Sequence, residues 1–267
     1  MSDCETNIWA NFLRESSKRS QNQESTCVIV GNENCGKKTI AASICGTEIA
    51  ANTHGDILSF SYFDVEEKDL DAATRVNMWL FNTKIFNFAP EILSAAQKNE
   101  KIVFVIVLDL SQPDTCLPTL QEWLARVGSF TKKFLESLPA EEASHLMKLH
   151  SSYLRNARTN KGIASKTENE NEETEDDDDI SMAEFFSLPI LVIGNKADTI
   201  SVDSSTAMKR TRELQGRIRS LCSDVGASLL FTSTTTSTGN KSNELKKYLL
   251  HRLYPDQISM ELQLEVL

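Results

Sequence analysis

Two short polar loops, each placed directly after an apolar run, constrain the fold of this chain most strongly. The first run, Thr26 to Val30, leads into a loop with the spacing G-x-x-x-x-G-K. Backbone N–H groups of such a loop, and of the helix that follows it, surround phosphate oxygens while the lysine neutralises their charge. We assign nucleotide-phosphate binding to all residues of this loop: Gly31, Asn32, Glu33, Asn34, Cys35, Gly36, Lys37, Lys38 and Thr39.

The second loop follows the apolar run Ile190 to Ile193 and begins with Asn195, Lys196, Ala197 and Asp198. The carboxylate of Asp198 can accept hydrogen bonds from the N1–H and the exocyclic amine of guanine. Asn195 and Lys196 would orient the loop and cover the ring. The two loops together predict a guanine-nucleotide pocket. The open alternative is that glycines and Asn or Asp residues merely shape turns at strand ends.

Several residues that GTP hydrolysis needs are replaced in this chain. The phosphate motif normally ends in a serine or threonine whose hydroxyl binds Mg²⁺, and here that residue is Lys38. Thr39 cannot take over, because one step along a helix turns the side chain by about 100°. After the third strand, where GTPases carry an Asp-x-x-Gly segment that holds Mg²⁺ and positions water, Asn82 replaces the aspartate, Ile85 replaces the glycine, and no glutamine follows. We expect no metal site and no catalytic residue, and either GDP bound without catalytic Mg²⁺ or an empty pocket.

Two further polar positions are ambiguous. Asp109 follows the apolar run Ile102–Leu108 and could be a metal-binding acid, but a cap of the turn before Gln112 is the commoner role. Thr232 and Ser233 resemble the loop that closes over guanine in GTPases, although Ser/Thr-rich runs usually form plain loops. We leave all three outside the predicted site.

Charge and cysteine content exclude several classes of partner. The formal net charge is −10, of which residues 168–179 supply nine negative charges and no positive one, leaving −1 for the rest. A nearly neutral domain has no overall electrostatic attraction to nucleic acid or to an anionic membrane. No apolar run reaches the roughly 18 residues of a membrane span. The six cysteines form no C-x-x-C pair, which favours a reduced, cytoplasmic protein.

Apolar runs alternate with helical patterns along most of the chain. Expected strands are Thr26–Val30, Leu58–Val65, Arg75–Phe81, Ile102–Leu108, Leu188–Gly194 and Ser228–Ser233. Expected helices lie around Ile40–Ile44 and at Pro90–Gln97, Leu117–Leu138, Glu141–Arg155, Ser204–Asp224 and Ser242–Leu253. This alternation predicts an α/β fold with one early hairpin, a mostly parallel sheet and helices on both faces.

The domain boundaries follow from composition. Residues 1–24 read as an amphipathic helix with a linker, and residues 25–254 as one P-loop domain. Within that domain, residues 156–183 read as a disordered acidic insertion, because they are charged and poor in aromatic side chains. Residues 255–267 read as the start of a C-terminal extension.

The chain resembles the dynein light intermediate chains. The resemblance is carried by segments in the same order: residues 7–13 (Asn7-Ile8-Trp9-Ala10-Asn11-Phe12-Leu13), the loop Gly31 to Thr39, residues 76–80, Asp109 to Pro113, Leu120 to Trp123, Leu188 to Val192, and Lys196 to Asp198. It covers about residues 7–254. The Trp9 segment and the Asp109-to-Trp123 stretch are more specific to this family than the nucleotide motifs.

The resemblance implies a divergent Ras-like G-domain fold and a non-catalytic subunit of cytoplasmic dynein. It implies docking on the dynein heavy-chain tail within the dynein complex, support of microtubule-based transport, and a cytoplasmic location on microtubules, with the centrosome as one site. In that family cargo adaptors bind a long C-terminal region. The chain ends at Leu267, so adaptor binding is expected only of a longer form. The alternative function is a Ras-like GTPase or a switch gated by GDP and GTP.

Overall fold

The computed structural model describes residues 23–46, 58–65, 74–96, 101–163, 187–199, 205–233 and 239–254. The helix predicted within residues 1–24 lies outside these ranges, apart from Gln23 and Glu24, as do the acidic run 168–179 and the segment 255–267. In the described part of the chain no helix has the length and apolar character needed to cross a membrane.

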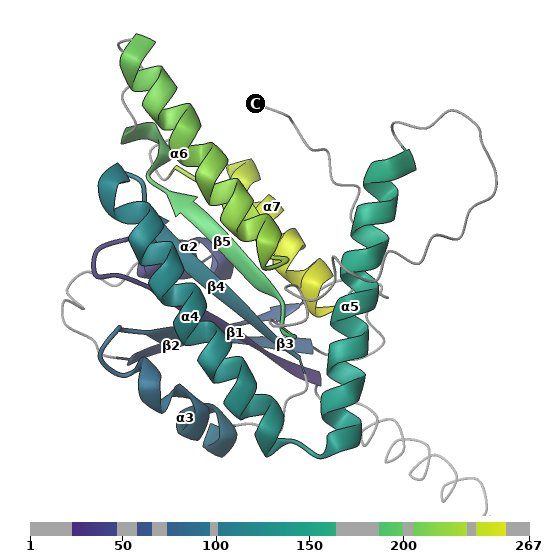
Figure 1. The fold of residues 1–267 in the computed structure, drawn as a ribbon. Coiled ribbons are helices and arrows are strands. Elements are labelled where there is room, and N and C mark those ends of the chain that lie inside the picture. Colours follow the sequence, from purple (N-terminus) through teal and green to yellow (C-terminus); the bar gives the residue numbers. More distant parts are fainter. Residues whose placement is uncertain are drawn as a thin grey trace, which may run out of the picture.

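A six-stranded sheet runs through the centre of the protein, with the strand order β2-β3-β1-β4-β5-β6 (Figure 1). Strand β2 pairs with β3 in the antiparallel sense, and all other pairings in this sheet are parallel. The strands are β1 (Gln23–Gly31), β2 (Leu58–Val65), β3 (Thr74–Phe81), β4 (Ile102–Asp109), β5 (Ile190–Asn195) and β6 (Ser228–Phe231). The predicted hairpin and the mostly parallel sheet are confirmed.

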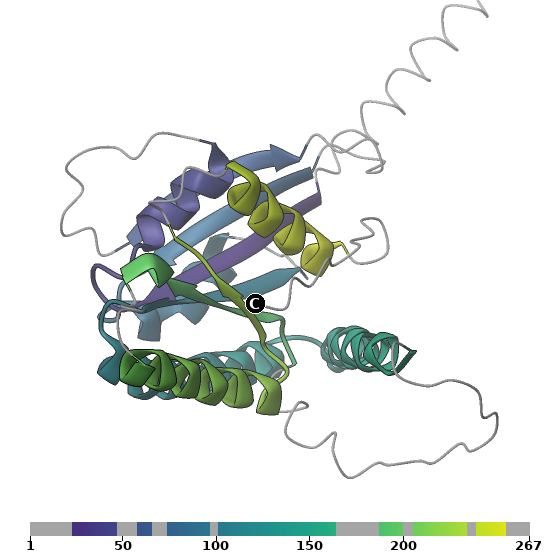
Figure 2. The same cartoon turned by 90° about the horizontal axis from the view of Figure 1, so that it is seen from above.

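Helices cover both faces of the sheet, as predicted (Figure 2). One face packs against α2 (Lys37–Cys45) and α7 (Gly239–Leu253). The other face packs against α3 (Ala89–Ala96), α4 (Pro113–Ser137) and α6 (Ser205–Asp224). Two short 3₁₀ helices, η1 (Phe86–Phe88) and η4 (Ala197–Thr199), follow β3 and β5.

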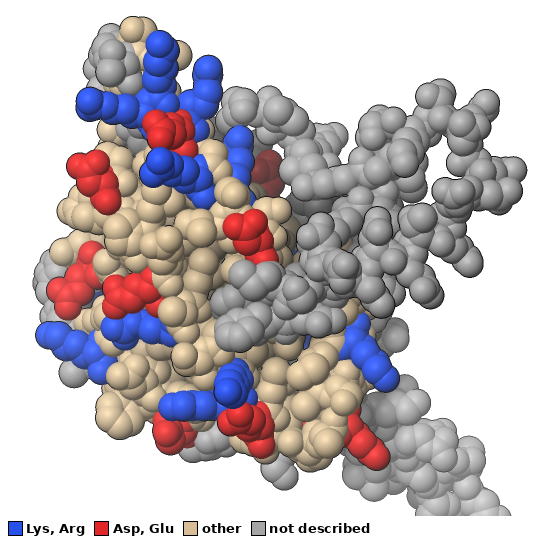
Figure 3. All heavy atoms as spheres, viewed as in Figure 1, with Lys and Arg blue, Asp and Glu red and all other residues tan. Residues whose placement is uncertain are grey.

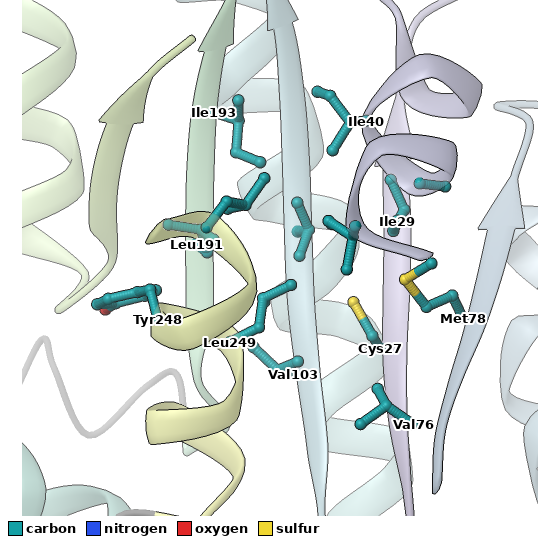
Figure 4. Packing of buried hydrophobic residues seen from close by; sticks show 14 of the residues in the cluster. Cys27, Ile29, Ile40, Val76, Met78, Val103, Leu191, Ile193, Tyr248 and Leu249 are labelled. Carbon is teal, nitrogen blue, oxygen red and sulfur yellow. The ribbon is translucent and has the colours of Figure 1, made fainter. Parts of the chain in front are cut away.

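Strand β4 shows why the sheet needs both helical layers. Its side chains point alternately to the two faces, and its first seven residues are all buried. Val103 and Val105 pack toward α2 and α7, whereas Phe104 and Ile106 pack toward α3, α4 and α6. Figure 4 shows Val103 beneath Leu249 of α7. Burying each such side chain stabilises the fold by about 1.5–3 kcal/mol, so a strand apolar on both faces must lie between two layers.

Several element boundaries differ from the prediction. Strand β1 begins at Gln23 rather than Thr26, because pairing with β3 extends along polar residues that hydropathy alone does not mark as strand. Helix α4 begins at Pro113 rather than Leu117, since proline fits the first helical position, where its missing N–H is not needed. A helix α5 spans Ala140–Ile163 and so continues past Arg155 into the range assigned to the acidic insertion.

Helix α5 packs against the end of α7 through aromatic and charged side chains. The ring centroids of Tyr153 and His251 are 5.6 Å apart, and the Arg252 guanidinium lies 3.6 Å from the Tyr153 centroid. Next to them, burial and the charge of Arg252 lower the pKa of His150 to about 4. The Lys101 ammonium, just before β4 begins, lies 4.2 Å from the ring of Tyr254. Helix α5 therefore occupies the end of the sheet where the parallel strands start.

Candidate functional site

The phosphate-type loop lies at the opposite end of the sheet, between β1 and α2. Its glycines are required by geometry. Gly36 has φ +96°, and a Cβ there would lie 2.2 Å from Nδ2 of Asn195. Gly31 has φ +149°, and a Cβ there would lie 2.4 Å from the carbonyl oxygen of Val107. The loop therefore follows its path only with glycine at both positions.

Lys37, the first residue of α2, folds back over the loop. Its Nζ donates hydrogen bonds to the carbonyl oxygens of Gly31 and Asn32, both at 2.7 Å. Burial raises the pKa of the nearby Cys35 thiol, which stays neutral and leaves the positive charge of the lysine uncancelled. The loop thus presents backbone N–H groups, the start of a helix and a fixed cation together, as phosphate binding requires.

The two predicted loops meet, although they are far apart in the sequence. The side chain of Asn195, at the end of β5, is buried and donates from Nδ2 to the carbonyl oxygen of Cys35 at 2.9 Å. Its Oδ1 accepts a hydrogen bond from Thr232 Oγ1 at 3.2 Å. Asp198 Oδ1 accepts one from Ser233 Oγ at 2.5 Å. The loop Gly31 to Thr39, on the phosphate side of the predicted pocket, and the loop that begins at Asn195, on its base side, therefore form one continuous site.

Thr232 and Ser233, which were left outside the predicted site, contact its residues. Strand β6 ends at Phe231, and these two residues then contact the base-side loop. Backbone bonds join the same segments, because Thr232 N donates to Gly194 O at 2.9 Å. Their position directly after the last strand was the available signal, since loops at the carboxyl ends of parallel strands gather at one edge.

A buried tryptophan supports the phosphate-type loop from below. Trp123 of α4 is fully buried and donates from Nε1 to Oδ1 of Asn32 at 3.1 Å. The Asn32 amide nitrogen in turn donates to Thr119 Oγ1 at 3.2 Å. The spacing of apolar residues along α4 places Trp123 in the core, but nothing in the sequence shows that its N–H donates to the loop. The side chain of Asn32 is therefore held by α4.

Asp109 serves as a turn cap and as an ion-pair partner. Its Oδ1 accepts hydrogen bonds from Ser111 N at 3.0 Å and Ser111 Oγ at 2.5 Å, which agrees with the cap interpretation. Its Oδ2 lies 2.5 Å from Lys196 Nζ, a contact that the sequence did not predict. Burial alone would raise the pKa of Asp109, but hydrogen bonds from Lys196 and Ser111 outweigh it and lower the pKa below 3.8.

Replacing Asp109 by asparagine should destabilise the protein in a pH-dependent way. Because the folded pKa lies below the unfolded one, the stabilisation is complete above pH 3.8 and is lost as the pH falls through the folded value. Asp109→Asn should therefore lower the free energy of unfolding by about 1 kcal/mol at neutral pH, after allowing for solvent screening. The difference from wild type should shrink in strong acid, as measured by urea unfolding at both pH values.

The matched control is Asp224→Asn, which changes an exposed aspartate at the end of α6. Its effect on the free energy of unfolding should be small, because the side chain is exposed. An Asp109→Asn variant that costs as much in strong acid as at neutral pH would show that the ion pair does not stabilise the loop.

The segment after β3 forms a tight turn. Ile85 N donates to Asn82 O at 3.1 Å, and Ile85 packs against the core as η1 begins. The Asn82 side chain donates from Nδ2 to Glu33 Oε1 at 3.4 Å, which links this turn to the phosphate-type loop. Within the described ranges no three His, Cys, Asp or Glu side chains are grouped so that they could hold a metal ion.

The residues present fit a guanine nucleotide better than they fit Mg²⁺. The glycine-shaped loop, Lys37, and the positioned carboxylate of Asp198 match the phosphates and the base. The two metal-binding positions of such a site are instead a lysine, Lys38, and an amide, Asn82. Bound Mg²⁺ would therefore lack its usual protein ligands here.

Comparisons with known proteins agree with the fold and the motifs. The family model described as "Dynein light intermediate chain (DLIC)" matches residues 3–263. The chain is 27% identical to cytoplasmic dynein 1 light intermediate chain 1 of Rattus norvegicus over 267 residues, which is 93% of this chain and 50% of that protein. The Homo sapiens protein gives the same identity and coverage. The chain thus spans about half the length of these curated relatives.

A solved structure gives the same arrangement of elements. The crystal structure of the dynein light intermediate chain's conserved domain matches with a TM-score of 0.61 and 17% sequence identity, covering 92% of this chain and 80% of that one. The fold expected from the resemblance, a mixed α/β Ras-like fold, is confirmed. Since the family model covers nearly the whole sequence, the chain belongs to the dynein light intermediate chain family.

Proposed function

We propose that this chain is a non-catalytic light intermediate chain subunit of cytoplasmic dynein. It binds the dynein heavy-chain tail and supports microtubule-based transport in the cytoplasm, in association with the microtubule cytoskeleton. The observation that carries this proposal is the family match across residues 3–263. Cargo adaptors are assigned to no residue, because the chain spans only about half of its relatives.

The alternative, a GTPase or nucleotide-gated switch, is opposed by the geometry after β3. Hydrolysis needs a metal-binding acid and a group that positions water. Asn82 offers an amide to Glu33 instead, and Ile85 points an apolar side chain into the core. The alternative is supported by Lys37 and by the contacts of Asn195 and Asp198. Hydrolysis of GTP that disappears in Lys37→Ala would establish it.

A guanosine diphosphate held without turnover fits the site best. Such a ligand stabilises the folded state by mass action, because it binds no unfolded chain. The Glu33 carboxylate of the loop, which accepts a hydrogen bond from Asn82, adds a negative charge beside the phosphates and so disfavours a more highly charged triphosphate. Denaturing the purified protein and chromatographing the released small molecules would show GDP. Asp198→Ala should lose the preference for GDP over ADP.

Helix α6 is the surface that we propose for heavy-chain docking. It carries five basic residues, Lys209, Arg210, Arg212, Arg217 and Arg219, against two acidic ones, Glu213 and Asp224. Figure 3 shows Lys and Arg side chains gathered at the end of the molecule where α6 begins. Arginine is enriched among the residues that dominate binding energy at interfaces. Arg210 and Arg212 are both exposed and suit mutation.

The experiment is co-expression with a dynein heavy-chain tail, followed by size-exclusion chromatography at physiological salt. The wild-type chain should co-elute stoichiometrically. The double variant Arg210→Glu, Arg212→Glu should separate from the tail, whereas the same charge change at Lys132 and Lys133, exposed on α4, should not. Separate elution of the wild-type chain would sink the subunit proposal, and equal behaviour of the two variants would exclude α6 as the docking face.

A further inference from the structure

Two positions around the phosphate-type loop both differ from the usual GTPase pattern. One is Lys38, which stands where a hydroxyl normally binds Mg²⁺. The other is Asn82, whose neutral amide stands where a metal-binding carboxylate is expected. One change adds a positive charge and the other removes a negative charge. The site has therefore lost its metal ligands without becoming more negative.

The net charge of the two residues present equals that of the usual metal ion and its carboxylate ligand. An Mg²⁺ ion together with one carboxylate carries a net charge of +1, and a lysine ammonium beside a neutral amide also carries +1. An ammonium group supplies three N–H donors and binds phosphate as a point charge. A lysine at this position can thus neutralise the same phosphate oxygens, although it cannot act as a multivalent ligand centre.

The Asn82 side chain provides a second, independent observation. Its Nδ2 is turned toward Glu33, at 3.4 Å from Oε1. Its Oδ1 is buried and accepts no hydrogen bond within the described part of the chain. A buried acceptor without a donor is unfavourable, so a donor is expected to reach it in the ligand-bound state. An ammonium group, which carries three N–H donors, meets that requirement.

We propose that Lys38 takes the place of Mg²⁺, so that this chain binds guanosine diphosphate without a divalent metal. In the bound state the Lys38 ammonium contacts the β-phosphate and donates to Oδ1 of Asn82. Lys37 keeps its place across the loop, where it already bonds to Gly31 O and Asn32 O. The inference rests on the guanine pocket of the proposed function and specifies which cation completes it.

The test is calorimetric titration of GDP into nucleotide-free protein, once with EDTA and once with excess Mg²⁺. Wild-type affinity should be the same in both buffers, within about twofold, because no metal takes part. Lys38→Met should weaken binding by about 10- to 100-fold in both buffers, the range expected for one charge-assisted hydrogen bond. Lys38→Thr restores the usual hydroxyl and should bind more tightly with Mg²⁺ than with EDTA.

The control is Lys133→Met, which removes an exposed lysine from α4 and should bind GDP as wild type does. Thermal melts without nucleotide should match across all variants, which separates lost binding from lost folding. Wild-type affinity that falls tenfold or more in EDTA overturns this inference alone, as does wild-type affinity in Lys38→Met. Failure of every protein to bind GDP in both buffers overturns the guanine pocket as well, and co-elution with the heavy-chain tail would still stand.

Discussion

Trp123→Ala is expected to lower the free energy of unfolding by about 3–5 kcal/mol, as for other fully buried aromatic side chains. The indole makes an edge-on contact with Phe86 at a centroid distance of 5.3 Å and lies under the guanidinium of Arg126. It also donates the hydrogen bond that holds Asn32. Removing the indole leaves a cavity beneath the phosphate-type loop and deprives the Asn32 side chain of this hydrogen bond. Urea unfolding followed by far-UV circular dichroism measures the change.

Trp123→Phe separates packing from hydrogen bonding. Phenylalanine keeps most of the ring contact with Phe86 but cannot donate to Asn32, so about 1–2 kcal/mol of the loss should remain. If Trp123→Ala and Trp123→Phe lower the free energy of unfolding equally, the hydrogen bond to Asn32 contributes more to stability than the packing of the ring does. If Trp123→Ala costs less than about 1 kcal/mol, the tryptophan does not support the site.

Gly36→Ala is the second substitution with a large expected effect. The new Cβ would lie 2.2 Å from Nδ2 of Asn195, and φ at this residue is +96°. Asn195 is buried and would have to give up its hydrogen bond to Cys35 O. We expect the free energy of unfolding to fall by about 2–4 kcal/mol, from strain and from a polar group left unpaired. The same variant should lose GDP binding, because the phosphate-side and base-side loops separate.

Two other glycines provide graded controls in the same urea experiment. Gly46 has φ +67° but open space around a Cβ, so Gly46→Ala should show the backbone penalty alone, about 1–2 kcal/mol. Gly216 lies within α6 with open space, so Gly216→Ala should stabilise the helix by up to about 1 kcal/mol. Any other ranking of the three alanine variants would show that the close approach to Asn195 is not what requires glycine at Gly36.

Most of the fold could be predicted because its signals are local. Apolar runs of strand length and the early hairpin gave the strands, and their alternation with helical patterns gave the parallel sheet. Convergence of the two motif loops also followed, since the loops at the carboxyl ends of the parallel strands β1 and β5 lie at the same edge of the sheet. The contact between Asn195 and Cys35 fulfils that expectation. Boundaries were less accurate where pairing or a proline at a helix start outweighed local hydropathy.

The side-chain contacts of the site could not be predicted in the same way. The bond from Trp123 to Asn32 joins residues 91 positions apart, and the pair Lys196–Asp109 joins residues 87 apart. Both depend on the side-chain rotamers and the register that folding sets, and no spacing in the sequence encodes them. Helical periodicity places Trp123 in the core but cannot say where its N–H points. Lys196 likewise reads as a base-covering residue until β4 and β5 are seen side by side.

The length of strand β4 sets the distance between helix α5 and the loops at the other end of the sheet. Helix α5 lies where the parallel strands start, and the nucleotide-type loops lie where they end. The eight residues of β4, at a rise of about 3.3 Å each, separate these ends by about 26 Å. A protein seated on α5 and a small molecule in the loops would thus be held apart by a stiff spacer, and either could come and go while the other remained in place.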